Sequence, residues 1–375
     1  MKWHIPFGFL LVGAFLMYFP ELKDRLDYPR FLLTFLYFGF FWMAMATSWN
    51  ILTGYSGYFS FGHGAFYGAG VYTSAALVTK SGLPFLLTLP LAGLMSAALG
   101  VVVGVVVFRL RQLRGEMFGL LTLAVDFVLA SVVRNSDFID GGFGLSLGRV
   151  EYPEILGTFP EMIYRVGLGI AFLTIFSAYL VQNSRLGRGL FAIRDDEAVA
   201  EGLGVPTFRY KMIAFGLSAF FAGLAGGLHT AQIGYVTVEG TFNLTVPLFV
   251  ILMSLLGGRQ HWLGPALGAI IIHTFNDAFS DTRFQLLNEI IIGVLLIVII
   301  LFLPEGIYDR LRKRIVPASI LAAIVTVIQM QTIGGRITEQ ATVVIFVVLG
   351  LLMIPEGFYR RSVGRFLFTH DAAGM

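Results

Sequence analysis

Long apolar segments constrain the fold of this chain more than any other feature. Runs of about 20 apolar residues, the length that a helix needs to cross a hydrocarbon core of roughly 30 Å, recur from Ile5 to Ile354. Because backbone amides in lipid must be hydrogen-bonded within each segment, these runs predict α-helices. A β-barrel would show short alternating segments, whereas residues 290–303 are apolar on every face. The sequence therefore predicts an all-α fold, a polytopic transmembrane helical bundle.

The composition agrees with a membrane location. Of the 375 residues, 57% are hydrophobic and 13% are charged, whereas soluble domains carry roughly 25% charged residues. The formal net charge of +3 is small, and the basic residues form short clusters between apolar segments, a pattern typical of membrane topology and not of nucleic-acid binding. The chain contains no cysteine, which excludes disulfides and thiolate metal sites.

The apolar segments divide the chain into predicted spans. They lie near residues 5–20, 31–53, 62–79, 84–108, 117–134, 163–183, 210–234, 244–257, 263–280, 286–303, 316–333 and 341–355. The first segment lacks a small-residue cleavage pattern after Tyr18, so we expect a mature helix there and not a signal peptide.

Basic residues predict which loops face the cytoplasm, because short cytoplasmic loops are enriched in lysine and arginine. Three loops are rich in them, with Arg109, Arg111 and Arg114 in one, Arg185, Arg188, Arg194, Arg209 and Lys211 in another, and Arg310, Arg312, Lys313 and Arg314 in the third. The loop 135–162 has Arg149 as its only basic residue beside five acidic residues, so it is predicted to lie outside.

One pattern recurs at two predicted span ends. Residues 303–308 read Leu-Pro-Glu-Gly-Ile-Tyr and residues 354–359 read Ile-Pro-Glu-Gly-Phe-Tyr. Each proline is predicted to end a helix at the cytoplasmic interface, and either a duplication or ordinary helix-stop chemistry arising twice explains the repeat. We divide the chain into a transmembrane core at 1–315 and an extra C-terminal transmembrane hairpin with a cytoplasmic tail at 316–375.

The most informative stretch is residues 50–72, which contains six glycines, at positions 54, 57, 62, 64, 68 and 70. So many glycines are costly in an ordinary helix. They permit either a helix that is interrupted beside a solute path or very close helix packing. Under the first interpretation Asn50, Ser60 and His63 are candidates to line the path.

His63 is the one histidine in this stretch. A lone histidine in a membrane can ligate a metal, relay protons or hydrogen-bond a neighbouring carbonyl, and the last role is the commonest. No second histidine stands four residues away, as a helical metal site would require. We therefore expect a hydrogen bond at His63 and predict no metal site and no cofactor.

Asp126 interrupts an otherwise apolar span. A carboxylate near a helix centre costs roughly 2.5–3.5 kcal/mol on insertion scales, so Asp126 is expected to face the bundle interior. There it either influences the path or makes a structural hydrogen bond or ion pair. Asn243 and Asp277 are weaker path candidates because, like Asn276, they lie near predicted span ends, where interface residues are commoner.

The stretch 187–206 is a polar cytoplasmic loop with a helical pattern inside it. Asp195 is predicted to cap a short helix that ends at Gly204 and Pro206. Small residues give this helix a low-relief surface suited to docking into another protein, namely Ala198, Ala200 and Gly202. The alternative is a solvated connector of mixed charge.

These two stretches closely resemble the LivM/LivH family of branched-chain amino acid permeases, nearer to its LivM side. The glycine-rich run of residues 54–66 is similar to the first family signature, and residues 197–204 are similar to the loop that such permeases present to their ATPases. Residues 222–227 and 257–265 are similar as well, and the resemblance spans about residues 31–306. It implies an α-helical ABC importer permease in a bacterial inner membrane, paired with a second permease, two cytoplasmic ATPase subunits and an extracytoplasmic binding protein.

The resemblance also implies which residues couple the chain to an ATPase. The candidates are Arg194, Asp195, Asp196, Glu197, Ala198, Ala200, Glu201 and Gly204. Three departures from the family pattern weaken any inference about the solute: Gln260 and His261 replace the usual Gly-Ser, Asp126 replaces a common glutamate, and residues after about 315 extend beyond the usual end.

The chain has no Gly-x-x-x-x-Gly-Lys-Ser/Thr loop, so ATP must be hydrolysed by a partner. We expect alternating access, in which ATPase closure moves the 194–204 helix and rocks the bundle around the path. The competing classes are an ion-coupled secondary carrier, a membrane-embedded enzyme, for which no catalytic motif is present, and a structural or receptor protein. Branched-chain amino acids are the expected solutes, with urea or short amides as alternatives.

Overall fold

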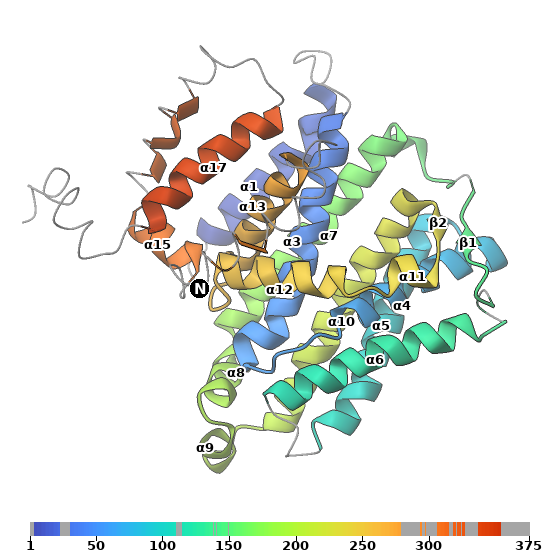
Figure 1. Cartoon of the computed structure of the whole chain (residues 1–375), viewed down its shortest axis with the longest axis horizontal. Coiled ribbons are helices and arrows are strands. Elements are labelled where there is room, and N and C mark those ends of the chain that lie inside the picture. Colours follow the sequence, from blue (N-terminus) through green and yellow to red (C-terminus); the bar gives the residue numbers. More distant parts are fainter. Residues whose placement is uncertain are drawn as a thin grey trace, which may run out of the picture. The chain divides into compact units, whose positions relative to one another are not determined.

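The computed structural model describes residues 4–22, 31–109, 115–137, 139, 141–148, 150–278, 306–314 and 337–353, with short pieces between 293 and 326. Most of these residues are helical (Figure 1). The chain divides into two compact units, Met1–His273 and Thr274–Met375.

The first unit contains most of the helices. In chain order they are α1 (His4–Tyr18), the 3₁₀ turn η1 (Phe19–Leu22), α3 (Phe31–Ser56), α4 (His63–Ser81), α5 (Phe85–Val107), α6 (Glu116–Arg134), the 3₁₀ turn η2 (Glu154–Leu156), α7 (Phe159–Asn183), α8 (Arg185–Asp195), α9 (Glu197–Gly202), α10 (Thr207–Ile233), α11 (Val238–Thr241), α12 (Thr245–Gly257) and α13 (Gly264–Ala278). α13 continues into the second unit. Two short strands, β1 (Leu145–Ser146) and β2 (Tyr235–Val236), pair antiparallel.

Six described helices are long and apolar enough to cross a membrane. They are Phe31–Ser56, Phe85–Val107, Met117–Arg134, Phe159–Asn183, Thr207–Ile233 and Val238–Gly257. Each coincides with a predicted span, which confirms the all-α polytopic fold. Shorter apolar helices at Leu11–Glu21 and Val343–Leu352 lie in two further predicted spans. The predicted span 286–303, most of 316–333 and the Pro-Glu-Gly motifs fall largely outside the described residues.

α10 lies at the centre of the first unit, where it packs against α3, α4 and α5. Glycines let the backbones of α4 and α10 touch. A Cβ atom on Gly70 would lie 2.1 Å from the carbonyl oxygen of Gly223, and one on Gly226 would lie 2.3 Å from that of Tyr67. No other residue permits so close an approach of two helices. Close packing, one of the two interpretations of the glycine-rich stretch, is therefore found in α4.

The second unit contains α15 (Ile307–Lys313) and α17 (Ile337–Met353), which contact each other. Arg310 Nη1 donates a hydrogen bond to the carbonyl oxygen of Leu352 at 2.9 Å, and Arg314 Nη1 donates to that of Leu351 at 2.7 Å. The basic cluster of α15 thus satisfies carbonyl groups in the last turn of α17, which have no partner within a helix.

Candidate functional site

The segment 57–62 interrupts the helical structure between α3 and α4. The chain turns at Gly57, which has a φ of +77°, and runs back along α3. Trp49 Nε1 donates to the carbonyl oxygen of Ser60 at 2.7 Å, and His63 lies beside Ser48. Because Ser48 precedes the end of α3 by eight residues, α4 begins about 12 Å inside that end. The predicted interruption is therefore present, with Tyr58, Ser60 and Gly62 buried and Gly57 exposed, and its place beside a solute path stays a prediction.

Two predicted path residues, His63 and Ser60, are fixed by hydrogen bonds within this region. Ser48 Oγ donates to the carbonyl oxygen of Met45 at 2.7 Å, so it accepts from His63 Nε2, which lies 2.8 Å away. Ser60 Oγ accepts from the backbone N–H of Gly62 at 3.2 Å. The expected hydrogen bond of His63 is present, with the Ser48 hydroxyl as a partner. The absence of a metal or cofactor stays a prediction.

Asn50 and Asp126 are buried, and by strict hydrogen-bond geometry each has polar atoms without a partner among the described residues. Neither amide atom of Asn50 makes a hydrogen bond to a described residue, and the same holds for Asp126 Oδ1. Asp126 is 1% exposed, which confirms that it faces the interior. A Cβ atom on Gly64 would lie 2.9 Å from Asp126 Oδ1, so the carboxyl group borders the first turn of α4, the positive end of that helix.

Replacing Asp126 tests whether this carboxyl group serves transport. Asp126→Leu should preserve membrane insertion, which leucine favours, and reduce uptake by about tenfold, the change that corresponds to 1.4 kcal/mol. Uptake by vesicles with a matched amount of inserted protein is the measurement, with the nearly isosteric Asp126→Asn variant separating charge from volume. Parental uptake by both variants would assign Asp126 a structural role.

The remaining path candidates lie elsewhere. Asn243 Oδ1 accepts from the backbone N–H groups of Thr245 and Val246 at 3.1 and 3.4 Å, and its Nδ2 donates to the carbonyl oxygen of Gly240. The Asn243 side chain is thus engaged in capping the start of α12, a local role that the sequence reasoning did not foresee. Asp277 is half-buried near the end of α13, in the second unit.

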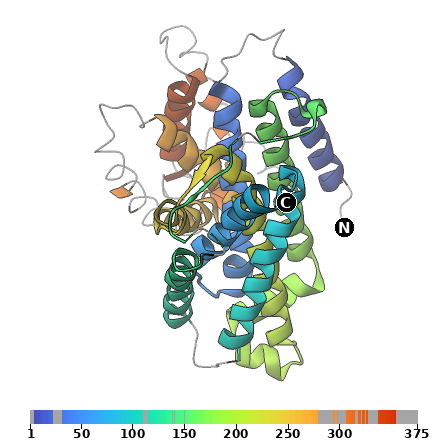
Figure 2. The ribbon, with the colours of Figure 1, turned by 90° about the vertical axis from the view of Figure 1, so that its right-hand side faces the viewer.

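α8 and α9 lie together at one end of the first unit, at the bottom of Figures 1 and 2. Asp195 was predicted to cap the short helix, but it is the last residue of α8. Asp196 is the cap, since its Oδ1 accepts from the N–H groups of Ala198 and Val199 at 2.8 and 3.0 Å. The cap lies one residue later than predicted, because Asp195 still belongs to α8.

α9 ends at Gly202, and Gly204 stops it as predicted. This glycine has a φ of +86°, and the N–H of Val205 donates to the carbonyl oxygen of Ala200 while that of Gly204 donates to Glu201. These bonds form a Schellman motif, which favours glycine at this position. A β-branched residue here would strain the turn.

The expected low-relief surface of α9 is partly wrong. Ala200 is buried and Glu197 is 8% exposed, so neither can meet a partner. The exposed residues are Ala198, Glu201, Gly202 and two large apolar side chains, Val199 and Leu203, which are 57% and 80% exposed. Beside them Arg194 Nη1 donates to the carbonyl oxygen of Gly54 at the end of α3.

Glu197 points inward to a group that we call the Tyr58 cluster, formed by Tyr58, Glu197 and Lys211. Lys211 Nζ lies 2.6 Å from Glu197 Oε1 and 3.1 Å from the Tyr58 hydroxyl, which donates to Glu197 Oε2 at 2.5 Å. All three residues are buried. The sequence reasoning missed this cluster, because Lys211 looked like one more basic residue of a cytoplasmic loop and nothing marked Tyr58 as its partner.

A second missed feature surrounds His229 on α10. The Tyr37 hydroxyl lies 3.0 Å from His229 Nδ1, and the ring of Phe41 stacks on the imidazole at 4.5 Å between centroids. The rings of Phe38 and Tyr67 lie within 6.1 Å. This half-buried imidazole adds a polar group to the interior that no sequence spacing indicated.

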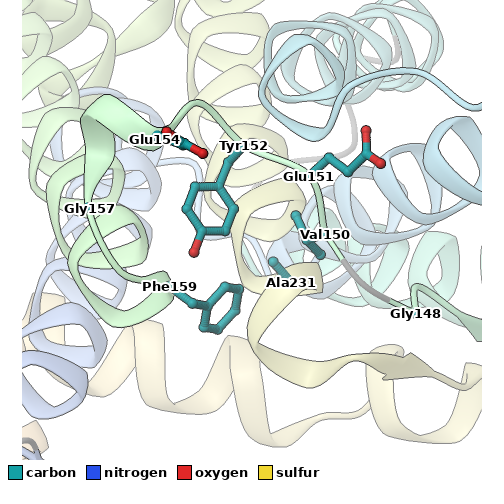
Figure 3. A pocket seen from close by; sticks show the side chains of 8 residues that line it. All are labelled: Gly148, Val150, Glu151, Tyr152, Glu154, Gly157, Phe159 and Ala231. Carbon is teal, nitrogen blue, oxygen red and sulfur yellow. The ribbon is translucent and has the colours of Figure 1, made fainter.

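The acidic loop that was predicted to lie outside lines a cavity of about 800 Å³. Figure 3 shows the rings of Tyr152 and Phe159 beside Ala231, the α10 residue that borders the cavity, with Glu151 directed away from them. The two rings lie 6.3 Å apart. The wall combines aromatic and acidic side chains, and Glu154 is the second carboxylate.

Comparisons with known proteins found one matching family and several similar proteins. A family described as branched-chain amino acid transport system / permease component matches residues 31–300. The high-affinity branched-chain amino acid transport system permease protein LivM of Escherichia coli (strain K12) is 30% identical over 291 residues, 71% of this chain and 67% of that protein. The probable branched-chain amino acid transport permease protein LivM of Methanocaldococcus jannaschii is 29% identical over 237 residues, 58% of this chain and 67% of that protein.

A relative with a different name matches a shorter part. The autoinducer 2 import system permease protein LsrC of Enterobacter sp. (strain 638) is 29% identical over 161 residues, 42% of this chain and 46% of that protein. No solved structure matches the chain. The family match includes the segment 57–62 and α9, and it ends before α15.

Proposed function

The chain belongs to the family of branched-chain amino acid transport system permease components, and from this premise we propose that it imports branched-chain amino acids as the membrane-spanning subunit of an ATP-driven transporter. The observation that carries the proposal is the family match over residues 31–300. The relatives named LivM favour this class of solute over urea or short amides.

Uptake by the reconstituted complex tests this proposal. Vesicles that contain the chain and its co-expressed partners should accumulate radiolabelled leucine only with internal ATP, and vanadate should abolish the accumulation. Valine and isoleucine should compete, whereas urea and acetamide should not. Accumulation driven by an ion gradient without ATP would identify a secondary carrier instead, and competition by urea alone would change the solute.

The proposed assembly has parts that this chain cannot supply. The chain contains no phosphate-binding loop, so two cytoplasmic ATPase subunits provide the energy and this chain hydrolyses no ATP. A second, related permease completes the path, and an extracytoplasmic binding protein delivers the solute. The setting is the inner membrane of a bacterium, with lipid around the six apolar helices.

We place the ATPase contact at α9. Val199 and Leu203 are large apolar side chains at the end of the unit that carries the basic loops, and exposed apolar patches of this kind mark docking surfaces. Movement of α9 during ATP hydrolysis would drive alternating access. Asn50, Ser60, His63 and Asp126 border the path in this mechanism, a role supported by their burial around the interrupted segment.

We also propose that residues 316–375 are an addition to the permease core, because the family match ends at residue 300. Truncation after Arg314 should leave assembly and uptake within about twofold of the parent, as removal of a peripheral element would. Copurification of the partners and leucine uptake are the measurements. Loss of assembly would show that the core needs the carbonyl partners of Arg310 and Arg314 in α17.

A further inference from the structure

The Tyr58 cluster joins three elements that are separate in the sequence. Glu197 is the first residue of α9, Lys211 lies in the second turn of α10, and Tyr58 lies in the segment 57–62. Hydrogen bonds to charged groups are the stronger kind, and here they connect all three pairs of side chains. The first residue of α9 is therefore held directly to the irregular segment.

Aromatic rings confine the cluster. The ring of Tyr58 stands edge-on to Phe108 and Phe118, with centroids 5.5 and 5.1 Å apart, and Lys211 Nζ lies 5.1 Å from the centroid of Phe108. A cavity of about 300 Å³ also borders Tyr58 and Glu197. A displacement of Glu197 therefore acts on Tyr58 through their hydrogen bond, and not through packing alone.

The segment that carries Tyr58 is held at its other end by α6. The N–H of Phe61 donates to Thr122 Oγ1 at 3.0 Å, and the first turn of α4 touches Asp126 through Gly64. Only Phe59 and Ser60 separate Tyr58 from Phe61. A shift of Tyr58 thus reaches the buried polar groups beside the interrupted helix through three peptide units.

We infer that the Tyr58 cluster transmits the movement of α9 to the segment 57–62 and the first turn of α4, with Tyr58, Glu197 and Lys211 as positioning residues. This inference rests on the proposed function. Stability alone does not require such a cluster, because apolar residues can replace a buried ion pair without loss of stability, whereas removal of one partner leaves a costly unpaired charge. What the charged pair adds is one fixed geometry between α9 and the segment.

The experiment separates stability from transmission. The complete transporter is reconstituted with each variant, and the melting temperature, ATP hydrolysis and leucine uptake are measured on the same preparation. Lys211→Met breaks the pair, Glu197→Met/Lys211→Met replaces it, and Tyr58→Phe removes one hydroxyl group. Arg134→Met is the control, because it breaks the exposed ion pair of Arg134 with Glu239.

We expect Lys211→Met to lower both the melting temperature and the amount of leucine taken up per ATP hydrolysed. The double variant should regain the parental melting temperature, yet its uptake per ATP should stay at least about fivefold below the parent, the lower end of typical coupling effects. Tyr58→Phe should lower this ratio as well, and Arg134→Met should not.

Two outcomes would overturn the inference. One is a double variant that regains both stability and the parental uptake per ATP, since the cluster would then be a structural anchor only. The other is a Tyr58→Phe variant that takes up as much leucine per ATP hydrolysed as the parent. This second result also decides the question when the double variant does not assemble. A parental complex without ATP-dependent leucine uptake is a distinct result, because it contradicts the proposed function before any variant is compared.

Discussion

Leu203→Glu is expected to weaken association with the ATPase by roughly 10- to 100-fold and to abolish uptake. Leu203 directly follows α9 and is 80% exposed. Burial of a leucine side chain in an interface contributes about 1.5–3 kcal/mol of binding free energy, and a glutamate would not provide that contribution. Copurification of the ATPase with the tagged chain measures the effect. The folding of this chain should not change, because the side chain has few contacts within it.

The matched control is Ile155→Glu, which places the same charge on an 86% exposed residue of the loop predicted to lie outside. It should leave ATPase association at the parental level. Equal recovery of ATPase with Leu203→Glu and the parent would remove α9 from the docking surface. Ala200→Trp is not a clean test of docking, because Ala200 is buried and tryptophan would unseat α9 from its own chain.

Gly226→Val is expected to destabilise the first unit strongly and to lower its melting temperature. The added Cβ would lie 2.3 Å from the carbonyl oxygen of Tyr67, and backbone atoms cannot move aside as a side chain does. Overpacking of this severity should cost about 3 kcal/mol or more, a large share of the 5–15 kcal/mol that stabilises a typical protein. The melting temperature of the detergent-purified chain is the measurement.

Gly169→Val is the control for this prediction. Gly169 lies within α7, and a Cβ atom there would meet nothing within 4 Å. The melting temperature should therefore stay close to that of the parent, since substitutions away from packed sites change stability by about 0.5 kcal/mol or less. Equal melting temperatures for the two valine variants would show that α4 and α10 do not touch through their glycines.

The sequence was most informative where lipid acts on each segment separately. α3, α5, α6, α7, α10 and α12 coincide with predicted spans, because the need to satisfy backbone groups in lipid depends on local composition. The interrupted helix at 57–62 also followed from local composition, through its glycines. The inward position of Asp126 followed from the cost of exposing a carboxylate to lipid.

The sequence was least informative where a side chain depends on a distant partner. Glu197 looked like a docking residue and is instead bonded to Lys211 and to Tyr58, 139 positions away in the chain. The imidazole of His229 meets the Tyr37 hydroxyl across 192 positions. No helical or strand spacing reports such contacts, since they arise only when helices pack. The amide of Asn243 is used by its own loop, a contact that its place near a predicted span end did not indicate.

The glycine contact between α4 and α10 also limits how the unit can change shape. Two helices that touch through backbone atoms have no rotamers between them to rearrange, so they behave as one rigid body. α12 and α13 are joined in the same way, through Gly257, Gly264 and Gly268. α12 meets α3 through the rings of Phe249 and Trp42 and through a hydrogen bond from Ser254 Oγ to the carbonyl oxygen of Ala46. Changes of shape within the first unit are therefore expected where helices meet through side chains, and not within these glycine-joined pairs.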